Sequence, residues 1–216
     1  MKEYEYLFVK HDNLSKLLKF YQNNVDDMVR PRPEKIIIEA VDNGAFYDLE
    51  DFNEEIKGAA GAYEYLQHKY IEIGSTKILE EVQGYGLHKL FITSRILNTI
   101  YFMPPEESIF CSIKKNNSKS INSVRKLGFE EWEPPEDLIT ARSEILDVSS
   151  NDNIQFMRFV QNQENLSIIA KEYLRCMSQS KFQNRDIQKP LIRVNIRLGY
   201  LSSQEAIQEI ARNILE

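Results

Sequence analysis

The chain has 216 residues, enough for one large domain or for a domain with an appendage. Its composition is ordinary for a soluble globular protein, with 42% hydrophobic residues, 28% charged residues and a net charge of −6. The absence of a long Lys/Arg cluster argues against a nucleic-acid-binding domain. No apolar run approaches the roughly 18 residues of a membrane span, so we expect no membrane segment.

The expected compartment is a reducing cytoplasm. The charged start, Met-Lys-Glu-Tyr-Glu-Tyr, lacks the apolar core of a secretory signal. The two cysteines, Cys111 and Cys176, stand in apolar surroundings and do not form a disulfide framework. The acidic balance would suit a cationic amine substrate, although such charges also serve simply to keep a surface hydrated.

The first 44 residues predict a strand followed by two helices. Residues 4–9 have the composition of a strand, and Asp12 or Asn13 then caps a helix over residues 14–21. Pro31 and Pro33 interrupt the chain. A second helix follows and ends at residues 43–44, although its Ile36-Ile37-Ile38 run also suits a strand.

Three strands are predicted next, over residues 45–51, 56–66 and 70–79. The second contains a run of small residues, Gly58-Ala59-Ala60-Gly61-Ala62. Small residues allow a neighbouring backbone or a ligand to come close.

The segment that follows these strands has the features of an anion site. Gln83-Gly84-Tyr85-Gly86-Leu87-His88 leads into a strong helical pattern over residues 87–97, which Pro104 and Pro105 stop. The first N–H groups of a helix lack internal partners, and glycine lets a phosphate approach the main chain. The same pattern can also be a plain turn, and it matches neither the dinucleotide fingerprint nor the P-loop.

A second strand and helix follow. Residues 109–113 form a short apolar strand, and Asn117 or Ser118 caps a helix with apolar residues at helical spacing. Gly128 ends this helix, and residues 129–132 begin a sixth strand.

Together the two segments resemble the signatures of the Gcn5-related N-acetyltransferase superfamily, over roughly residues 4–133. The first signature is Gln/Arg-x-x-Gly-x-Gly/Ala, here Gln83-Gly84-Tyr85-Gly86-Leu87-His88, with His88 in place of a small residue. The second is Asn-x-x-Ser/Ala followed by an apolar helix, here Asn117-Ser118-Lys119-Ser120 through Lys126-Leu127-Gly128-Phe129.

The resemblance implies an α+β fold, with a mixed, mostly antiparallel central sheet flanked by helices. It implies acetyl-CoA as cosubstrate, with the thioester arm between splayed fourth and fifth strands. The cofactor-binding residues would be Ile78, Leu79, Gln83, Gly84, Tyr85, Gly86, Leu87, His88 and Asn117.

The implied function is transfer of an acetyl group to a primary amine, on a small molecule or a protein, by direct attack. The alternative is a CoA-binding regulatory or interaction module of the same fold without turnover. The acceptor's identity is not readable from the sequence, and the oligomeric state stays open, with a homodimer as one option.

Glu72 on the fourth strand is the predicted catalytic base, because a carboxylate beside the thioester can take the amine proton; a salt bridge or a substrate-lining role is its alternative. Many relatives place an acid-donating Tyr where this chain has Val124. Tyr63 or Tyr65 could substitute, although a strand tyrosine usually packs. We expect Cys111 to be a buried strand residue without a base partner, and we expect no metal, since the histidines lack a ligand pattern.

The predicted domains are an acetyltransferase core over residues 1–135 and a C-terminal extension over residues 136–216. In the extension, residues 153–160 and 166–177 show helical periodicity, and residues 190–198 alternate like a half-buried strand. We expect a helical insertion, with residues 190–198 supplying the missing seventh strand of the sheet, and Ser202-x-x-Glu205 capping a last helix. A separate helical domain is the alternative.

Overall fold

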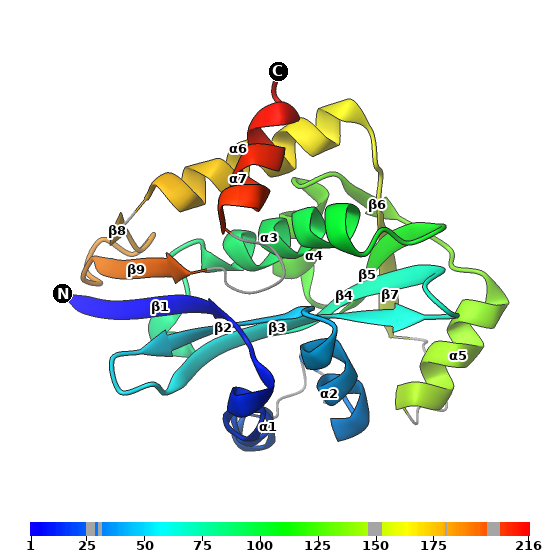
Figure 1. Ribbon diagram of the computed structural model, residues 1–216, viewed down its shortest axis with the longest axis horizontal. Coiled ribbons are helices and arrows are strands. Elements are labelled where there is room, and N and C mark those ends of the chain that lie inside the picture. Colours follow the sequence, from blue (N-terminus) through cyan, green and yellow to red (C-terminus); the bar gives the residue numbers. More distant parts are fainter. Residues whose placement is uncertain (25–28, 30–31, 147–152, 180, 198–203) are drawn as a thin grey trace.

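A computed structural model describes residues 1–24, 29, 32–146, 153–179, 181–197 and 204–216. In it, one nine-stranded sheet lies between two layers of helices (Figure 1). Pro31 and the predicted cap at Ser202 fall outside the described residues. Within the part that is described, no helix is both long and apolar enough to cross a membrane.

The elements follow the predicted order as far as the sixth strand. The strands are β1 (Lys2–Phe8), β2 (Phe46–Asp51), β3 (Ile56–Tyr65), β4 (Tyr70–Ile78), β5 (Ser108–Lys114), β6 (Phe129–Glu131), β7 (Ile154–Phe159), β8 (Lys181–Phe182) and β9 (Ile192–Arg197). The α-helices are α1 (Leu14–Asn23), α2 (Glu34–Asp42), α3 (Leu87–Phe102), α4 (Ser118–Arg125), α5 (Glu136–Leu146), α6 (Gln163–Ser178) and α7 (Gln204–Asn213). Residues 36–38 are therefore helical, and α2 buries Ile37, Ala40 and Val41.

The sheet is mixed and mostly antiparallel, which confirms the predicted fold class. Its order is β6-β7-β5-β4-β3-β2-β1-β9-β8. Only two neighbouring pairs in the described sheet are parallel, β4 with β5 and β1 with β9. Helices α1, α2 and α5 cover one face, while α3 and α4 cover the other (Figure 1).

Strands β4 and β5 separate after a short common stretch. Their ladder consists of the pairs Tyr70–Ser108, Ile71–Ile109 and Glu72–Phe110, although both strands continue to Ile78 and Lys114. The splay that the resemblance implies is therefore present. We call this pair of diverging segments, residues 73–78 and 111–114, the notch.

The prediction of a helix over residues 153–160 is wrong, because this segment is strand β7. It pairs antiparallel with β5 on one side and with β6 on the other. Both faces of the strand carry buried residues, Phe156 on one and Met157 and Phe159 on the other, so the apolar positions lose the alternation of a half-buried strand. The resulting spacing imitates a helix.

Residues 192–197 do form a strand, but not at the predicted place in the sheet. The seventh position, between β5 and β6, belongs to β7, while β9 pairs in parallel with β1 on the far side. The C-terminal extension thus supplies strands on both sides of one sheet. The division at residue 135 stays a prediction.

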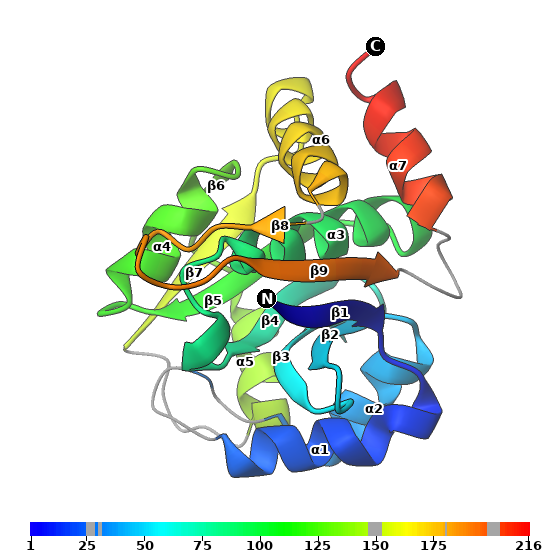
Figure 2. The ribbon, with the colours of Figure 1, turned by 90° about the vertical axis from the view of Figure 1, so that its left-hand side faces the viewer.

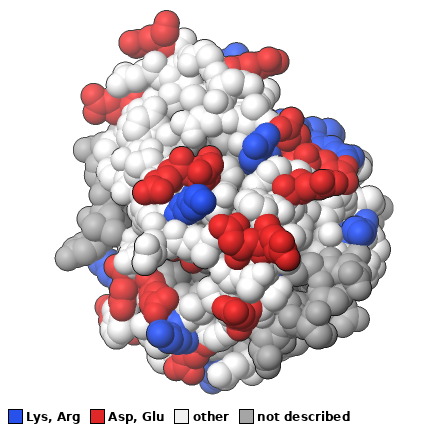
Figure 3. All heavy atoms as spheres, turned by 90° about the vertical axis from the view of Figure 1, so that its right-hand side faces the viewer, with Lys and Arg blue, Asp and Glu red and all other residues white. Residues whose placement is uncertain are grey.

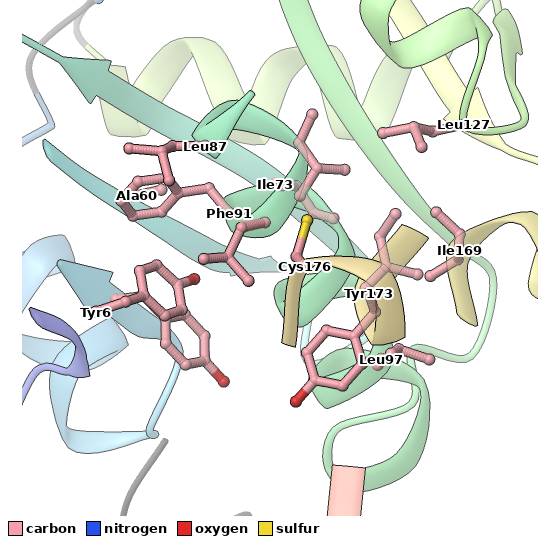
Figure 4. Packing of buried hydrophobic residues seen from close by; sticks show 14 of the residues in the cluster. Tyr6, Ala60, Ile73, Leu87, Phe91, Leu97, Leu127, Ile169, Tyr173 and Cys176 are labelled. Carbon is pink, nitrogen blue, oxygen red and sulfur yellow. The ribbon is translucent and has the colours of Figure 1, made fainter. Parts of the chain in front are cut away.

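Helices α6 and α7 form a third layer outside α3 (Figure 2). Ile169, Tyr173 and Cys176 of α6 pack toward α3 in the core that also contains Phe91 and Leu97 (Figure 4). These side chains are almost completely buried. Helix α3 is consequently apolar around most of its circumference, since it has the sheet on one side and α6 on the other.

We predict that truncation after Glu136 yields a fragment without a cooperative fold. The truncation removes β7, which is the only strand joining β6 to β5 in the described sheet, and it uncovers the edge of β1. Size-exclusion chromatography and thermal melting monitored by circular dichroism would measure this. A soluble, cooperatively melting 1–136 fragment would show that the N-terminal part folds alone.

Candidate functional site

The notch leads to the N-terminus of helix α3, where several backbone donors are available. Gly86 precedes the helix with φ +82°, and no side chain caps the first turn. Among the described residues, the N–H groups of residues 84–88 donate to no acceptor. Outward-pointing amides at a helix N-terminus form an anion site, to which the helix dipole adds positive potential.

The two signature glycines have different surroundings. At Gly86 a Cβ atom would meet nothing within 4 Å, so this side of the main chain is open. At Gly84, which has φ +86°, a Cβ atom would lie 2.8 Å from Oδ1 of Asn184. The space beside the main chain at Gly84 is therefore occupied by a side chain of the C-terminal extension. The main chain at Gly86 stays open to a ligand.

The predicted pantetheine-binding backbone at the end of β4 is partly engaged. Gln83 Nε2 donates to the carbonyl oxygen of Ile78 at 2.8 Å, and the N–H of Leu79 donates to the oxygen of Lys57 at 2.8 Å. A ligand amide that bound Ile78 would replace the Gln83 side chain, which is exposed. The structure thus brings Ile78 and Gln83 together at the mouth of the notch.

The second signature meets the first at its helix N-terminus. Asn117 caps α4 by accepting from the N–H of Ser120 at 3.1 Å, as predicted. Ser123 of the same helix lies 3.4 Å from Nδ1 of His88. Burial, with Arg95 and Lys119 nearby, lowers the pKa of His88 to about 4, so its imidazole is neutral at pH 7. A cofactor contact by Asn117 stays a prediction.

Strand β4 carries a bulge within the notch. Ala59 and Gly61 of β3 face Lys77 and Gly74, so two residues of β4 stand opposite one residue of β3. Ser75, one of the two, has φ +50°, a left-handed conformation that is uncommon for a residue with a side chain. Tyr21 of α1 donates to the Ser75 carbonyl oxygen at 2.5 Å.

Arg95 of α3 holds this bulge from beneath. Its Nη1 donates to the carbonyl oxygens of Gly61 and Gly74 at 2.6 and 3.0 Å, and its Nη2 donates to Oγ1 of Thr76 at 2.9 Å. The side chain is 1% exposed. Burial lowers its pKa to about 10, which leaves the guanidinium charged at neutral pH. The helix that begins at the anion site therefore also fixes the bulge.

Glu72 lies on the opposite face of the sheet, in a closed network. Its Oε2 is 2.8 Å from Nη2 of Arg32 and 3.3 Å from Nε of Arg142. Tyr65 donates its hydroxyl to Oε2 at 2.9 Å, and Ser112 also hydrogen-bonds the carboxylate. The side chain has no exposed surface.

These contacts argue against Glu72 as the catalytic base. Burial alone would raise the pKa of the carboxyl, but Arg142 and Arg32 outweigh it and lower the pKa to about 2. An efficient base has a pKa near the working pH and a lone pair within reach of the amine. The geometry supports the alternative role that the sequence left open for Glu72, a salt bridge. Here the ion pairs connect α5 and residue 32 to β4.

Several residues of this site were not anticipated. Arg95 had a visible signal, since a long cationic side chain interrupts an otherwise apolar helix. Arg142 had none, because it reaches Glu72 from 70 residues away in the sequence. Asn184 likewise contacts the signature loop from the distant extension. Within the described residues, no group of three His, Cys, Asp or Glu side chains is arranged for a metal.

Replacing Arg95 by Met should destabilise the protein strongly. The change leaves the carbonyl oxygens of Gly61 and Gly74 buried without a donor, and each such loss costs about 1–3 kcal/mol. Urea unfolding at pH 7 measures the effect. Arg125→Met is the control, since Arg125 is exposed on α4 and should change stability by less than about 0.5 kcal/mol. Equal stability of the two variants would contradict the role given to Arg95.

Replacing Glu72 by Gln should cost about 3–5 kcal/mol, because it leaves two buried arginines without a counter-charge. The ordinary pKa of 4.5 is lowered to about 2 in the folded protein. The carboxylate therefore stabilises fully above pH 4.5, and this contribution is lost as the pH falls toward 2.

The stability gap between wild type and Glu72→Gln should accordingly narrow across this window in urea unfolding at graded pH. Glu64→Gln, at an exposed pair with His68, is the control and should show little gap. A gap independent of pH would refute the ion-pair account.

Comparison with known proteins gives matches only among solved structures. No family model matches the chain, and no curated protein matches it. It is similar to Naa50 of Arabidopsis thaliana in complex with the bisubstrate analogue CoA-Ac-MVNAL, with TM-score 0.52 and 17% identity over 72% of this chain and 96% of that one.

It is also similar to Rv2747 of Mycobacterium tuberculosis in complex with CoA and NLQ, with TM-score 0.52, 15% identity and coverage of 73% and 99%. A third structure is a mutant of the spermidine N-acetyltransferase SpeG from Vibrio cholerae, with TM-score 0.51, 15% identity and coverage of 73% and 94%. At these identities the likeness concerns the fold. The chain has the fold of the Gcn5-related N-acetyltransferases.

Proposed function

We propose that the protein is an acetyl-CoA-dependent N-acetyltransferase acting on a primary amine. The observation that carries this proposal is the notch between β4 and β5, which runs to a helix N-terminus whose amides have no acceptor among the described residues. The diverging strands leave backbone groups outside the β4–β5 ladder that a thioester arm would pair with, and a pyrophosphate would accept hydrogen bonds from the amides. The complexes of Naa50 and Rv2747 with CoA or a CoA-linked analogue support acetyl-CoA as the cosubstrate.

The surroundings of the notch favour direct attack of the amine over an acetyl-enzyme. Cys111 is the cysteine on β5, and burial together with the nearby Glu72 raises its pKa far above neutrality. A thiol in this state is not a nucleophile. Cys176 is buried on α6, on the outer side of α3, and burial raises its pKa to about 11, so it too stays a thiol at neutral pH.

Tyr63 is the better of the two tyrosines considered for protonating the leaving thiolate. The hydroxyl of Tyr65 is already shared between Glu72 and Arg32. The hydroxyl of Tyr63 has no such ionic partner among the described residues, and it lies beside Gly61, opposite the bulge. Burial raises its pKa to about 12, so it carries its proton at neutral pH.

With Glu72 held in ion pairs, the amine has to lose its proton largely to solvent. An α-amino group, with a pKa of about 7.7–8.0, is partly neutral at pH 7, whereas a lysine-type amine near 10.4 is almost wholly charged. We therefore propose an acceptor with a weakly basic amine, such as the N-terminus of a peptide. The face shown in Figure 3 carries mainly acidic side chains with scattered basic ones, which suits a polypeptide or amine better than a nucleic acid.

The second candidate is a CoA-binding module without turnover. The closed network around Glu72 is the observation that favours it, because the carboxylate beside the notch is not free to accept a proton. Val124 at the place of the usual tyrosine points the same way. Both candidates share the anion site and differ only in chemistry.

An amine panel separates the two candidates. The full chain is mixed with acetyl-CoA and with peptides bearing free N-termini, polyamines or lysine, and thiol release and acetylated product are measured, the product by mass spectrometry. The proposed enzyme acetylates N-terminal amines faster than lysine at pH 7, with a difference that shrinks as the pH rises. Acetyl-CoA binding without product from any amine would establish the module instead.

Replacing Gly86 by Glu should weaken acetyl-CoA binding at least tenfold, about 1.4 kcal/mol. The change places a negative charge at the open side of the anion site and forces a side chain onto φ +82°. Isothermal titration calorimetry measures the affinity, and Gly86→Gln controls for the backbone strain, since it has the same size without the charge. Unchanged binding in a folded Gly86→Glu protein would remove the pyrophosphate from this position.

A further inference from the structure

The connection between β8 and β9, residues 183–191, lies against the signature loop, residues 83–88 (Figure 2). Asn184, 4% exposed, donates from Nδ2 to the carbonyl oxygen of Gln83 at 2.8 Å, while its Oδ1 accepts from the N–H of Asp186. The N–H of Arg185 donates to the carbonyl oxygen of Gly84 at 3.1 Å. The hydroxyl of Tyr85 donates to the carbonyl oxygen of Pro190 at 2.7 Å. The extension is thus fastened to this loop at three points.

These contacts use carbonyl oxygens and one hydroxyl of the loop, and they leave its N–H groups untouched. The N–H groups of residues 84–88 still have no acceptor among the described residues. The fastening therefore fixes the loop without filling its anion site. The hydrogen bond from Arg185 N–H to the Gly84 carbonyl also holds the backbone of Arg185 directly against the loop.

The signature loop has little positive side-chain charge of its own. Lys89 is the first cation after the loop. Its Nζ lies 2.9 Å from Oε1 of Glu172 on α6, so its charge is already paired. Glu81, just before it, is shared between Lys2 and Lys57. Arg185, in contrast, is exposed and makes no ion pair or side-chain hydrogen bond with any residue that the structure describes. The backbone contact to Gly84 keeps this uncommitted guanidinium within the length of one side chain from the loop.

We propose that the β8–β9 connection is the second wall of the cofactor site, with Arg185 binding phosphate groups of CoA and Asn184 positioning the loop. This inference rests on the proposed function, since it takes CoA as the ligand. Arginine suits the role because its planar donors match phosphate oxygens and it stays charged. The C-terminal extension would then be needed for cofactor affinity as well as for the sheet.

The test compares Arg185→Glu, Arg185→Lys and wild type for binding of CoA, 3′-dephospho-CoA and pantetheine by calorimetry. Arg185→Glu should weaken CoA binding at least tenfold, Arg185→Lys should weaken it less because it keeps the charge without the planar donors, and pantetheine binding should not change. If Arg185→Glu and wild type bind 3′-dephospho-CoA equally well, Arg185 contacts the 3′-phosphate. If the variant also binds 3′-dephospho-CoA more weakly than wild type, Arg185 contacts the pyrophosphate. Arg212→Glu, the same charge change on exposed α7, should bind like wild type.

Asn184→Ala gives an independent readout. Loss of the Asn184 amide leaves the carbonyl oxygen of Gln83 without this donor and should weaken CoA binding several-fold. The ratio of the affinities for CoA and 3′-dephospho-CoA should stay the same as in wild type. CoA binding by Arg185→Glu at wild-type affinity would overturn this inference alone. Failure of the wild-type protein to bind CoA would overturn the proposed function and this inference with it.

Discussion

The buried guanidinium of Arg95 is the interaction on which the site depends. A bulge in the middle of a sheet leaves carbonyl oxygens out of register with their partners, and such groups are costly when they are buried. Arg95 supplies donors to Gly61 and Gly74 from the facing helix. The bulge, the divergence of β4 from β5 and the placement of α3 are therefore one structural unit.

That unit also explains the third layer of helices. An arginine buried beneath a sheet needs a rigid surrounding that excludes water, because any opening of the layer would let water compete for its carbonyl partners. Helix α6 packs Ile169 and Tyr173 on the outer side of α3, and both are completely buried. The C-terminal extension thereby presses α3 onto the sheet from outside while its strands widen that sheet.

The sequence predicted what depends on local pattern. The strand order up to β6, the α2 helix, the glycine turn at Gly84 and Gly86 and the Asn117 cap follow from short-range rules and from the two signatures. The same rules failed at β7, where burial on both faces removed the alternation that marks a strand. They also could not place β9, since its pairing with β1 joins segments that are almost the whole chain apart.

The site residues divide in the same way. Positions that act through the main chain, such as Gly86, can be placed from sequence because glycine and a helix start are local signals. The state of Glu72 cannot, since it is set by Arg32 and Arg142 from distant segments. Glu72 lies on the expected strand, where its position suggested a free base, but its contacts make it a buried ion-pair partner.

The parallel pairing of β9 with β1 has a consequence for synthesis of the chain. Arg193 and Glu3, an ion pair across these strands, are 190 residues apart. At about 5–20 residues per second, the ribosome needs roughly 10–40 seconds to make the intervening chain. During that time the outer edge of β1 has no strand partner, and exposed strand edges pair readily with other chains. On a polysome, β1 therefore stays open to pairing with neighbouring nascent chains until β9 has been made.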